Sequence, residues 1–266
     1  MDIQQELREL GISSTQGQHF INNEIAVRKF LNQTETKGKT VLEIGPGTGN
    51  ITEYIDAQKI YAVEKDTVLA QHLESKNLEE DIGVLTQDFL EIDVPEDVEY
   101  ILGNLPFQLS SEILEQVGDL QIPAAFIVQD ELADKVVASP GEPVFNFFSF
   151  KMSYFFIPVK AGEISSRNYY PEPEVETAVL KLFPEKERHG VEHEKEFLEF
   201  AKALFTHRRK KVRNALVDAR NILGMEKNVL KGFRDELPHS EEKVYELEVV
   251  EMNDVFQSFR DFKTSD

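Results

Sequence analysis

The most unusual stretch of the 266-residue chain is Asn104-Leu105-Pro106-Phe107, which follows a short apolar run. The amide oxygen of Asn104 and the backbone carbonyl of Leu105 could accept hydrogen bonds from an amine. Pro106 would stiffen the turn that aims them, and Phe107 would offer a flat face for an aromatic base. Such acceptors stabilise the positive charge that grows on an amine as it attacks an electrophile. Taken alone, the stretch reads equally well as a turn with a buried Phe.

A second stretch, Glu43-Ile44-Gly45-Pro46-Gly47-Thr48-Gly49, has three glycines in alternate positions. They allow a tight turn after a strand and a close approach of backbone to ligand. The spacing is neither the dinucleotide-binding pattern nor a nucleoside-triphosphate loop. An acid before the first glycine disfavours a pyrophosphate there and favours a ligand with a cationic end.

Two further carboxylates end expected strands. Glu64 follows the apolar residues 59–63, and Asp88 follows the run that begins at residue 82. An acid after a second strand can accept both hydroxyls of a ribose, and an acid after the third can accept from an exocyclic amine. Each alone is typical of a solvated loop, but the three strand-end sites in register favour a nucleoside pocket.

The elements that must position these residues alternate along the chain. The apolar segments 39–45, 59–66, 82–90 and 99–107 are predicted strands, and 123–137 is a strand leading into a helix. Helical spacing occupies 49–58, 67–78 and 110–120. Short apolar strands alternating with helices predict a mostly parallel sheet covered on both faces. Ligands of such sheets lie beyond the carboxyl ends of the strands.

The pattern of apolar and polar residues changes after residue 144. The aromatic, alternating residues between 145 and 183 predict longer strands that extend the sheet antiparallel, and helical periodicity follows the charged residues 185–190. We therefore predict an α/β domain over residues 1–185 and a small all-α domain over residues 186–266.

The charge is unevenly distributed. The net charge is −20, with 32 acidic and 13 basic residues up to residue 185 but 17 acidic and 16 basic residues after it. The densest basic run, His207 to Arg213, could be a solvated helix face or a phosphate-contact site. The chain has no cysteine, which excludes disulfides and thiolate metal sites. The N-terminus lacks a signal-peptide layout and no stretch is long enough to span a membrane. We expect a cytoplasmic protein, without a metal, that is a monomer.

The order of these motifs resembles a known family. The glycine loop, Glu64, Asp88 and Asn104-Leu105-Pro106-Phe107 resemble the successive motifs of class I S-adenosylmethionine-dependent methyltransferases with a Rossmann-like fold. The segments 17–21, 103–110, 128–131, 169–182 and 205–216 further resemble the ribosomal RNA adenine N6-dimethyltransferases of the small-subunit, kasugamycin-resistance type. The resemblance covers residues 17 to about 216.

The resemblance implies S-adenosylmethionine as methyl donor and the immature small ribosomal subunit as partner, with N6 of adjacent adenosines near the 3′ end of its RNA methylated. It implies catalytic roles for the four residues from Asn104 to Phe107 and for Tyr169, which could cover the other face of the base. The implied cofactor contacts are His19, Ile21, Glu43, Gly45, Gly47, Glu64, Asp88 and Asn104. The implied RNA contacts are Arg208, Arg209, Lys210, Lys211 and Arg213.

The sequence departs from the family pattern at three places. Phe107 stands where the family usually has Tyr, Phe147 replaces an Arg, and residues 13–16 replace basic residues. Two cationic RNA contacts are therefore missing, which affects RNA affinity more than the chemistry.

Three other functions share parts of this pattern. A large-subunit rRNA adenine methyltransferase of the macrolide-resistance type would have the same catalytic core. A ribosome-assembly factor could keep the fold without turnover, although the intact acids and Asn104 argue against it. A protein glutamine methyltransferase would use a similar loop but would need neither the Tyr169 motif nor the basic run.

Overall fold

The computed structural model describes residues 3–12, 18–76, 78 and 81–265. The chain divides into two compact units, which are described separately. The first comprises the chain up to Ala133 together with Ile157–Pro184, and the second comprises Asp134–Phe156 and the chain from Glu185 onward. In the described ranges no helix has the length and apolar character needed to cross a bilayer.

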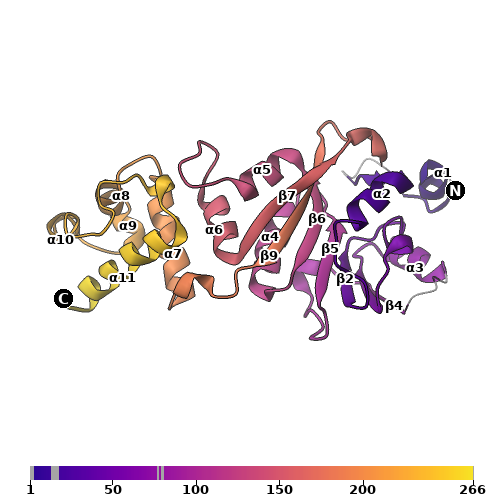
Figure 1. The fold of residues 1–266 in the computed structure, drawn as a ribbon, viewed down its shortest axis with the longest axis horizontal. Coiled ribbons are helices and arrows are strands. Elements are labelled where there is room, and N and C mark those ends of the chain that lie inside the picture. The colour runs from indigo at the N-terminus through magenta and orange to yellow at the C-terminus, as the bar shows by residue number, and fades with distance from the viewer. Residues whose placement is uncertain (1–2, 13–17, 77, 79–80, 266) are drawn as a thin grey trace. The chain divides into compact units, whose positions relative to one another are not determined.

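The first unit is built around one sheet (Figure 1). Its strands are β2 (Thr40–Ile44), β3 (Lys59–Val63), β4 (Ile82–Leu85), β5 (Tyr100–Asn104), β6 (Ala124–Gln129), β7 (Phe156–Ile164) and β9 (Thr177–Pro184). Its helices are α1 (Ile3–Glu9), α2 (Glu24–Leu31), α3 (Thr67–Ser75), α4 (Ser110–Leu120) and the start of α5 (Asp130–Val137), with 3₁₀ turns η2 (Thr52–Tyr54), η3 (Phe89–Glu91) and η4 (Ser166–Asn168). Two short strands, β1 (Phe20–Ile21) and β8 (Tyr169–Tyr170), pair with each other.

The sheet has the order β4-β3-β2-β5-β6-β9-β7. The first five strands are parallel, and β9 runs antiparallel to β6. The chain steps outward from β2 to β4 and then returns to β5 on the other side of β2. Because such crossovers are right-handed, α3 and α4 cover opposite faces, and a crevice opens between the carboxyl ends of β2 and β5. The prediction of a mostly parallel sheet with an antiparallel addition is confirmed.

Gly103 allows β2 and β5 to meet beside this crevice. A Cβ atom at Gly103 would lie 2.4 Å from the backbone oxygen of Ile44. A side chain at this position would force the two central strands apart. The glycine before Asn104 is therefore required by strand packing, and it brings Asn104 to the end of β2.

Two local predictions are wrong. Residues 49–58 form only the 3₁₀ turn η2 instead of a helix, because the chain must re-enter the sheet at Lys59. The aromatic residues after 145 do not begin a strand but form the helix α6 (Phe147–Phe155). Asn146 caps this helix, since its side chain accepts from the backbone N–H groups of Phe148 and Ser149.

The second unit is helical and has an aromatic core. It contains the end of α5, α6, α7 (Glu194–Phe205), α8 (Val212–Asp218), α9 (Arg220–Leu223), α10 (Lys227–Phe233) and α11 (Val249–Ser265), with turns η5 (Arg188–Gly190) and η6 (Val244–Glu246). The ring centroid of Phe150 in α6 lies 6.0 Å from that of Phe197 and 5.1 Å from that of Phe205, both in α7. The buried residues of α6 are spread around most of the helix, which explains why its sequence has little helical periodicity; they are Ser149, Phe150, Met152, Tyr154 and Phe155. Residues 134–156 thus join this unit, whereas the sequence analysis assigned them to the first domain.

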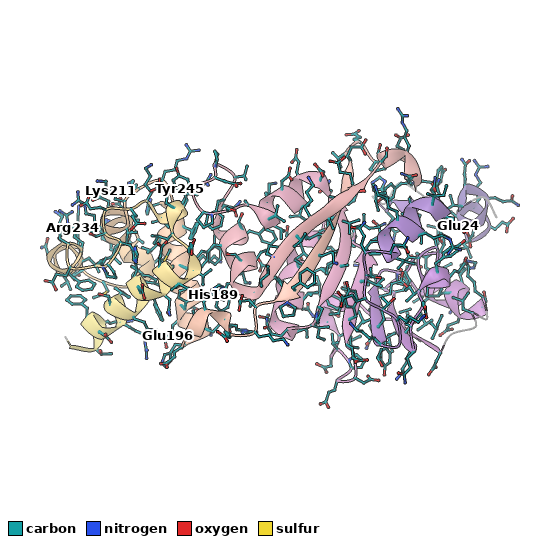
Figure 2. The ribbon with its side chains drawn as sticks, in the orientation of Figure 1. Glu24, His189, Glu196, Lys211, Arg234 and Tyr245 are labelled. Atoms are coloured by element: carbon teal, nitrogen blue, oxygen red, sulfur yellow. The ribbon has the colours of Figure 1, made fainter. Side chains whose placement is uncertain are left out.

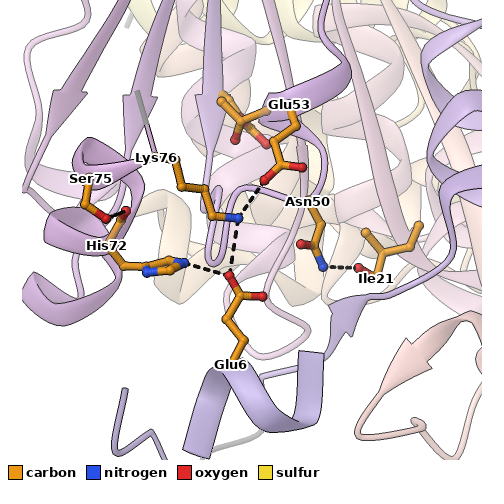
Figure 3. Close-up of polar contacts among 9 residues, drawn as sticks. Glu6, Ile21, Asn50, Glu53, His72, Ser75 and Lys76 are labelled. Atoms are coloured by element: carbon orange, nitrogen blue, oxygen red, sulfur yellow. Dashed lines mark hydrogen bonds and ion pairs between the residues drawn. The ribbon is translucent and has the colours of Figure 1, made fainter. Parts of the chain in front are cut away.

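Within the first unit, the N-terminal helix α1 is held by ion pairs as well as by apolar contacts. Glu6 lies 2.7 Å from His72 Nε2 and 3.3 Å from Lys76 Nζ, and Lys76 also lies 2.6 Å from Glu53 (Figure 3). Ile3, Leu7, Phe20 and Leu69 form a small apolar cluster nearby. The ion pairs and this cluster together hold α1 against α3 and β1.

Candidate active site

A cavity of ≈ 280 Å³ lies beyond the carboxyl ends of β2, β3, β4 and β5. The residues around it come from five segments that are far apart in the sequence. Its wall includes His19, Ile21, Gly45, Gly47, Glu64, Asp88, Asn104, Leu105, Pro106 and Phe107. The fold therefore brings ten of the residues implied by the resemblance into one cavity, at the edge where an α/β sheet binds ligands.

The glycine loop follows β2 with the left-handed conformation that its residues permit. Gly45, Gly47 and Gly49 have φ values of 66°, 57° and 87°. A Cβ atom at Gly47 would lie 2.9 Å from the Phe20 ring, so the loop and the N-terminal segment close on each other at this point. At its glycines, the loop therefore presents bare backbone, which can approach a ligand closely.

The Glu64 carboxylate is fixed by backbone groups. Its two oxygens accept from the N–H groups of Gly47 over 3.0 Å and of Asp66 over 2.9 Å. Burial raises the pKa of Glu64, while these two hydrogen bonds act in the opposite direction. Each oxygen retains a further lone pair, so the carboxylate can also accept from hydroxyl groups of a ligand.

Asp88 lies at the other end of the cavity, after β4. Its carboxylate accepts from the backbone N–H of Leu90 over 3.1 Å and lies 3.2 Å from Lys65 Nζ. The Leu90 hydrogen bond, followed by Lys65, holds the pKa of Asp88 below its ordinary value. The side chain is therefore an ionised acceptor that is held in place.

Asn104 at the end of β5 has an amide whose orientation is fixed by one bond. Its Nδ2 donates to the backbone carbonyl of His19 over 2.9 Å. Its Oδ1 is buried and has no hydrogen-bond partner among the described residues. A buried acceptor without a partner costs free energy, so this oxygen is suited to a donor from a ligand.

Phe107 presents its ring beside the same segment. The His19 ring stacks on it with centroids 5.0 Å apart and an interplanar angle of 27°. His19 Nδ1 in turn lies 2.8 Å from the carbonyl oxygen of Pro171. His19 thus connects the N-terminal segment, Phe107 and the segment after β8, and it covers one face of Phe107.

Leu105 and Pro106 shape the turn between Asn104 and Phe107. The N–H of Leu105 donates to Ile127 of the neighbouring strand β6 over 3.0 Å. The Pro106 carbonyl accepts from Ser110 Oγ over 2.9 Å, and Ser110 is the first residue of α4. These bonds continue the sheet through Leu105 and fix the turn at both ends.

Two of the residues implied for catalysis or cofactor binding do not line the cavity. Glu43 is 1% exposed and accepts from Thr52 Oγ1 over 2.6 Å, and its burial raises its pKa to about 8. Tyr169 is 3% exposed, its hydroxyl lies 2.8 Å from Thr177 Oγ1, and burial raises its pKa. The structure places Glu43 beneath the glycine loop and Tyr169 in the core, so direct contacts to cofactor and base by these side chains stay untested predictions.

Among the cavity residues that were not predicted from the sequence, two carry buried oxygens without a partner among the described residues. Gln18 and Thr48 line the cavity, and Gln18 Oε1 and Thr48 Oγ1 are buried without a partner in the described ranges. Gln18 is next to the implied contact His19, and Thr48 lies between two loop glycines. Their places within the motifs were visible in the sequence, but a polar residue beside a motif gives no sign of whether its side chain points inward.

The basic run of the second unit spans the connection between α7 and α8 and the first residues of α8. The Arg208 guanidinium donates to the backbone carbonyls of Pro143 and Phe145. Lys210 and Lys211 pair with acids, as Arg213 does. Within the described part of the chain, no recorded hydrogen bond or ion pair engages the exposed Arg209. Of the two positions where the family pattern has basic residues, Phe147 packs against other aromatic rings. The other, residues 13–16, lies outside the described residues, as does Gly17 of the 17–21 motif.

The cavity fits S-adenosylmethionine. The glycine loop offers backbone to the ligand, and three buried oxygens, on Gln18, Thr48 and Asn104, await hydrogen-bond donors. Glu64 and Asp88 follow adjacent strands, at the spacing over which a nucleoside presents its ribose and its base. The order Asp88, Glu64, Gly45, Asn104 matches the order of strands β4, β3, β2, β5.

Comparisons with known proteins agree with this geometry. The ribosomal RNA adenine dimethylase family model matches residues 12–259. A relative from Thermococcus onnurineus, named probable ribosomal RNA small subunit methyltransferase A, is 31% identical over 253 residues, which cover 92% of each chain. One with the same name from Thermococcus sibiricus is 29% identical over 255 residues, covering 93% of this chain and 92% of its own.

Solved structures show the same fold. A dimethyladenosine transferase from Plasmodium falciparum superposes with a TM-score of 0.80 at 18% identity, covering 92% of this chain and 98% of its own. The 23S rRNA methyltransferase ErmE superposes with a TM-score of 0.66 at 19% identity, covering 91% of this chain and 99% of its own. The chain belongs to the ribosomal RNA adenine dimethylase family, enzymes that transfer methyl groups from S-adenosylmethionine to adenine in ribosomal RNA.

Proposed function

We propose that the protein dimethylates N6 of adjacent adenosines near the 3′ end of small-subunit ribosomal RNA, on the immature subunit. The names of the relatives support this choice of subunit. The observation that carries the chemistry is Asn104, whose Oδ1 lacks a partner while its Nδ2 is held by His19. An acceptor fixed in this way is suited to an N6–H donor.

The side chains around Asn104 would activate a poor nucleophile. The lone pair of an exocyclic adenine amine is delocalised into the ring. Asn104 Oδ1 and the Leu105 carbonyl would accept from its N–H groups, which favours a pyramidal nitrogen and stabilises its developing positive charge. Phe107 would stack on the base with the face that His19 leaves open. The base must be splayed out of its helix or loop to reach these groups.

The remaining cavity residues would hold the cofactor. Glu64 would accept from the ribose hydroxyls and Asp88 from the adenine amine, while the glycine loop would approach the methionine end. The bound cofactor supplies an electrophilic methyl group on a sulfonium. Positioning of amine and methyl group then accounts for most of the rate, and the reaction requires neither a metal nor a covalent enzyme intermediate.

Residues 186–266 would serve as the RNA-binding domain, through the basic run from Arg208 to Arg213. This run is the densest basic segment of an acidic chain, and phosphate contacts require Lys and Arg. We further propose that the enzyme acts as a cytoplasmic monomer.

A methyl-transfer assay with immature small subunits tests the proposal. The expected product is dimethyladenosine at two adjacent positions, seen as reverse-transcription stops near the 3′ end. Transfer to naked 23S RNA but not to small subunits would instead identify the macrolide-resistance type. Binding of S-adenosylmethionine without transfer to any subunit would leave only an assembly role.

A further inference from the structure

Residues 208–213, the part of the basic run that we call the basic loop, lie against an acidic segment, residues 240–246. Four backbone hydrogen bonds join them, among them Val212 N to Glu242 O over 2.8 Å and Tyr245 N to Arg208 O over 3.0 Å. Lys211 and Lys243 also form an antiparallel bridge. The acids of this segment are therefore placed beside the basic loop by the backbone and not by side-chain contact alone.

Glu241 of the acidic segment binds two cations of the basic loop. Its Oε2 lies 2.5 Å from Lys211 Nζ, and its Oε1 pairs with the Arg213 guanidinium. One anion that offers different oxygens to a Lys and an Arg has the coordination that a phosphate group adopts in the same surroundings. Lys210 similarly lies 2.6 Å from Asp218.

These ion pairs are open to solvent and therefore exchangeable. The side chains of Lys211, Arg213 and Glu241 are 45%, 33% and 57% exposed. Exposed pairs contribute little to stability, so their opening costs little of the fold. Lys211 holds the pKa of Glu241 below its ordinary value, so a competing anion, and not mild acid, would release the cations.

We propose that an RNA phosphate group replaces the Glu241 carboxylate between Lys211 and Arg213, so that Glu241 limits the RNA affinity of this surface. This inference rests on the proposal that the basic loop binds RNA. RNA offers many phosphates at once, and their combined gain exceeds that of one carboxylate. A surface of this kind would favour RNA, with its regularly spaced phosphates, over small anions.

The test is the affinity of the full-length protein for a hairpin from the 3′ end of small-subunit RNA, measured by fluorescence anisotropy across salt concentrations. Glu241→Gln should tighten binding roughly three- to tenfold at low salt, and the gain should fade as salt screens the charges. Glu196→Gln is the matched control, because Glu196 pairs with Arg260. Both variants remove one negative charge from an exposed ion pair, and Figure 2 shows Glu196 well away from Lys211 in the same unit.

Lys211→Gln and Arg213→Gln complete the series. The proposal predicts that each weakens binding and that each removes the gain when combined with Glu241→Gln. It is overturned if Glu241→Gln binds no more tightly than Glu196→Gln. It is also overturned if neither Lys211→Gln nor Arg213→Gln weakens binding. Methylation of small subunits by the same protein would then show that the proposed enzymatic function still holds. Thermal unfolding of each variant establishes that the fold is retained.

Discussion

The side-chain amide of Asn104 donates to the backbone carbonyl of His19 over 2.9 Å, and this bond determines which end of the amide is left for a ligand. The free end is an oxygen, which can accept from an amine but cannot donate to one. The N-terminal segment thus orients the group that we expect to activate the target nitrogen.

Replacing this amide should reduce the rate of methyl transfer. Asn104→Ala removes one electrostatic contact to the transition state, which costs roughly 10²- to 10³-fold in kcat. Single-turnover methylation of small subunits measures the effect. Asn168→Ala is a suitable control because Asn168 makes the same kind of amide-to-carbonyl bond, to Ser165, away from the cavity. A rate for Asn104→Ala equal to that of the control would exclude the proposed role.

The ring of Phe107 should contribute to binding of the target base. Phe107→Ala should lower kcat/KM for the RNA, because stacking on one base is lost. The loss should correspond to about 1–3 kcal/mol of binding free energy. Phe107→Tyr keeps the ring and should retain activity. The Kd for S-adenosylmethionine, measured by calorimetry, should change little in either variant. A loss confined to cofactor affinity would show that Phe107 shapes the cavity without contacting the base.

The buried carboxyl of Glu43 should make the stability depend on pH. Its pKa rises from 4.5 to about 8 in the folded chain, so between these values the unfolded chain releases a proton that the folded chain retains. The free energy of unfolding therefore falls as pH rises through this window. Glu43→Gln retains an acceptor for Thr52 and cannot ionise.

Urea unfolding at several pH values checks the Glu43 prediction. The stability of Glu43→Gln relative to the wild type should increase from pH 5 to pH 8. A constant difference across this range would mean that Glu43 is already ionised in the folded protein.

The ion pairs of Glu6 should control the attachment of α1. Glu6→Gln leaves Lys76 with Glu53 as its ion-pair partner among the described residues. A lost hydrogen bond to a charged partner costs about 1–3 kcal/mol. Hydrogen exchange should become faster in residues 3–12, with little change in the central strands. Glu9→Gln alters the same helix at an exposed position, where Glu9 accepts from Gln5, and should leave the exchange unchanged. Equal exchange in both variants would show that the apolar contacts of Leu7 suffice.

The sequence predicted the sheet and most of the cavity because their signals are local. A short apolar strand, a glycine turn and a strand-end acid each lie within a few residues, and the order of the motifs places them side by side. The predicted strands were too long, as 59–66 against Lys59–Val63 shows, because polar residues at strand ends read as part of the strand.

What the sequence did not reveal depends on partners elsewhere in the chain. The helix α6 buries residues around most of its circumference, so its period could not be distinguished from that of a strand. The inward-pointing oxygen of Gln18 and the pairing of Lys211 with Glu241 depend on segments 30 or more residues away. Such contacts follow from packing and leave no pattern in the local sequence.

The pairing of β1 with β8 has a consequence for the synthesis of the chain. Phe20 pairs with Tyr170, and Asn22 donates to the carbonyl of Asn168. Two strands of two residues each cannot persist alone, so the wall formed by His19 and Ile21 is complete only after residue 170 has left the ribosome. A nascent chain that ends earlier gains little stabilisation from the cofactor, because a ligand stabilises only the state that binds it. The cofactor can therefore help the enzyme fold only after its chain has emerged from the ribosome as far as residue 170.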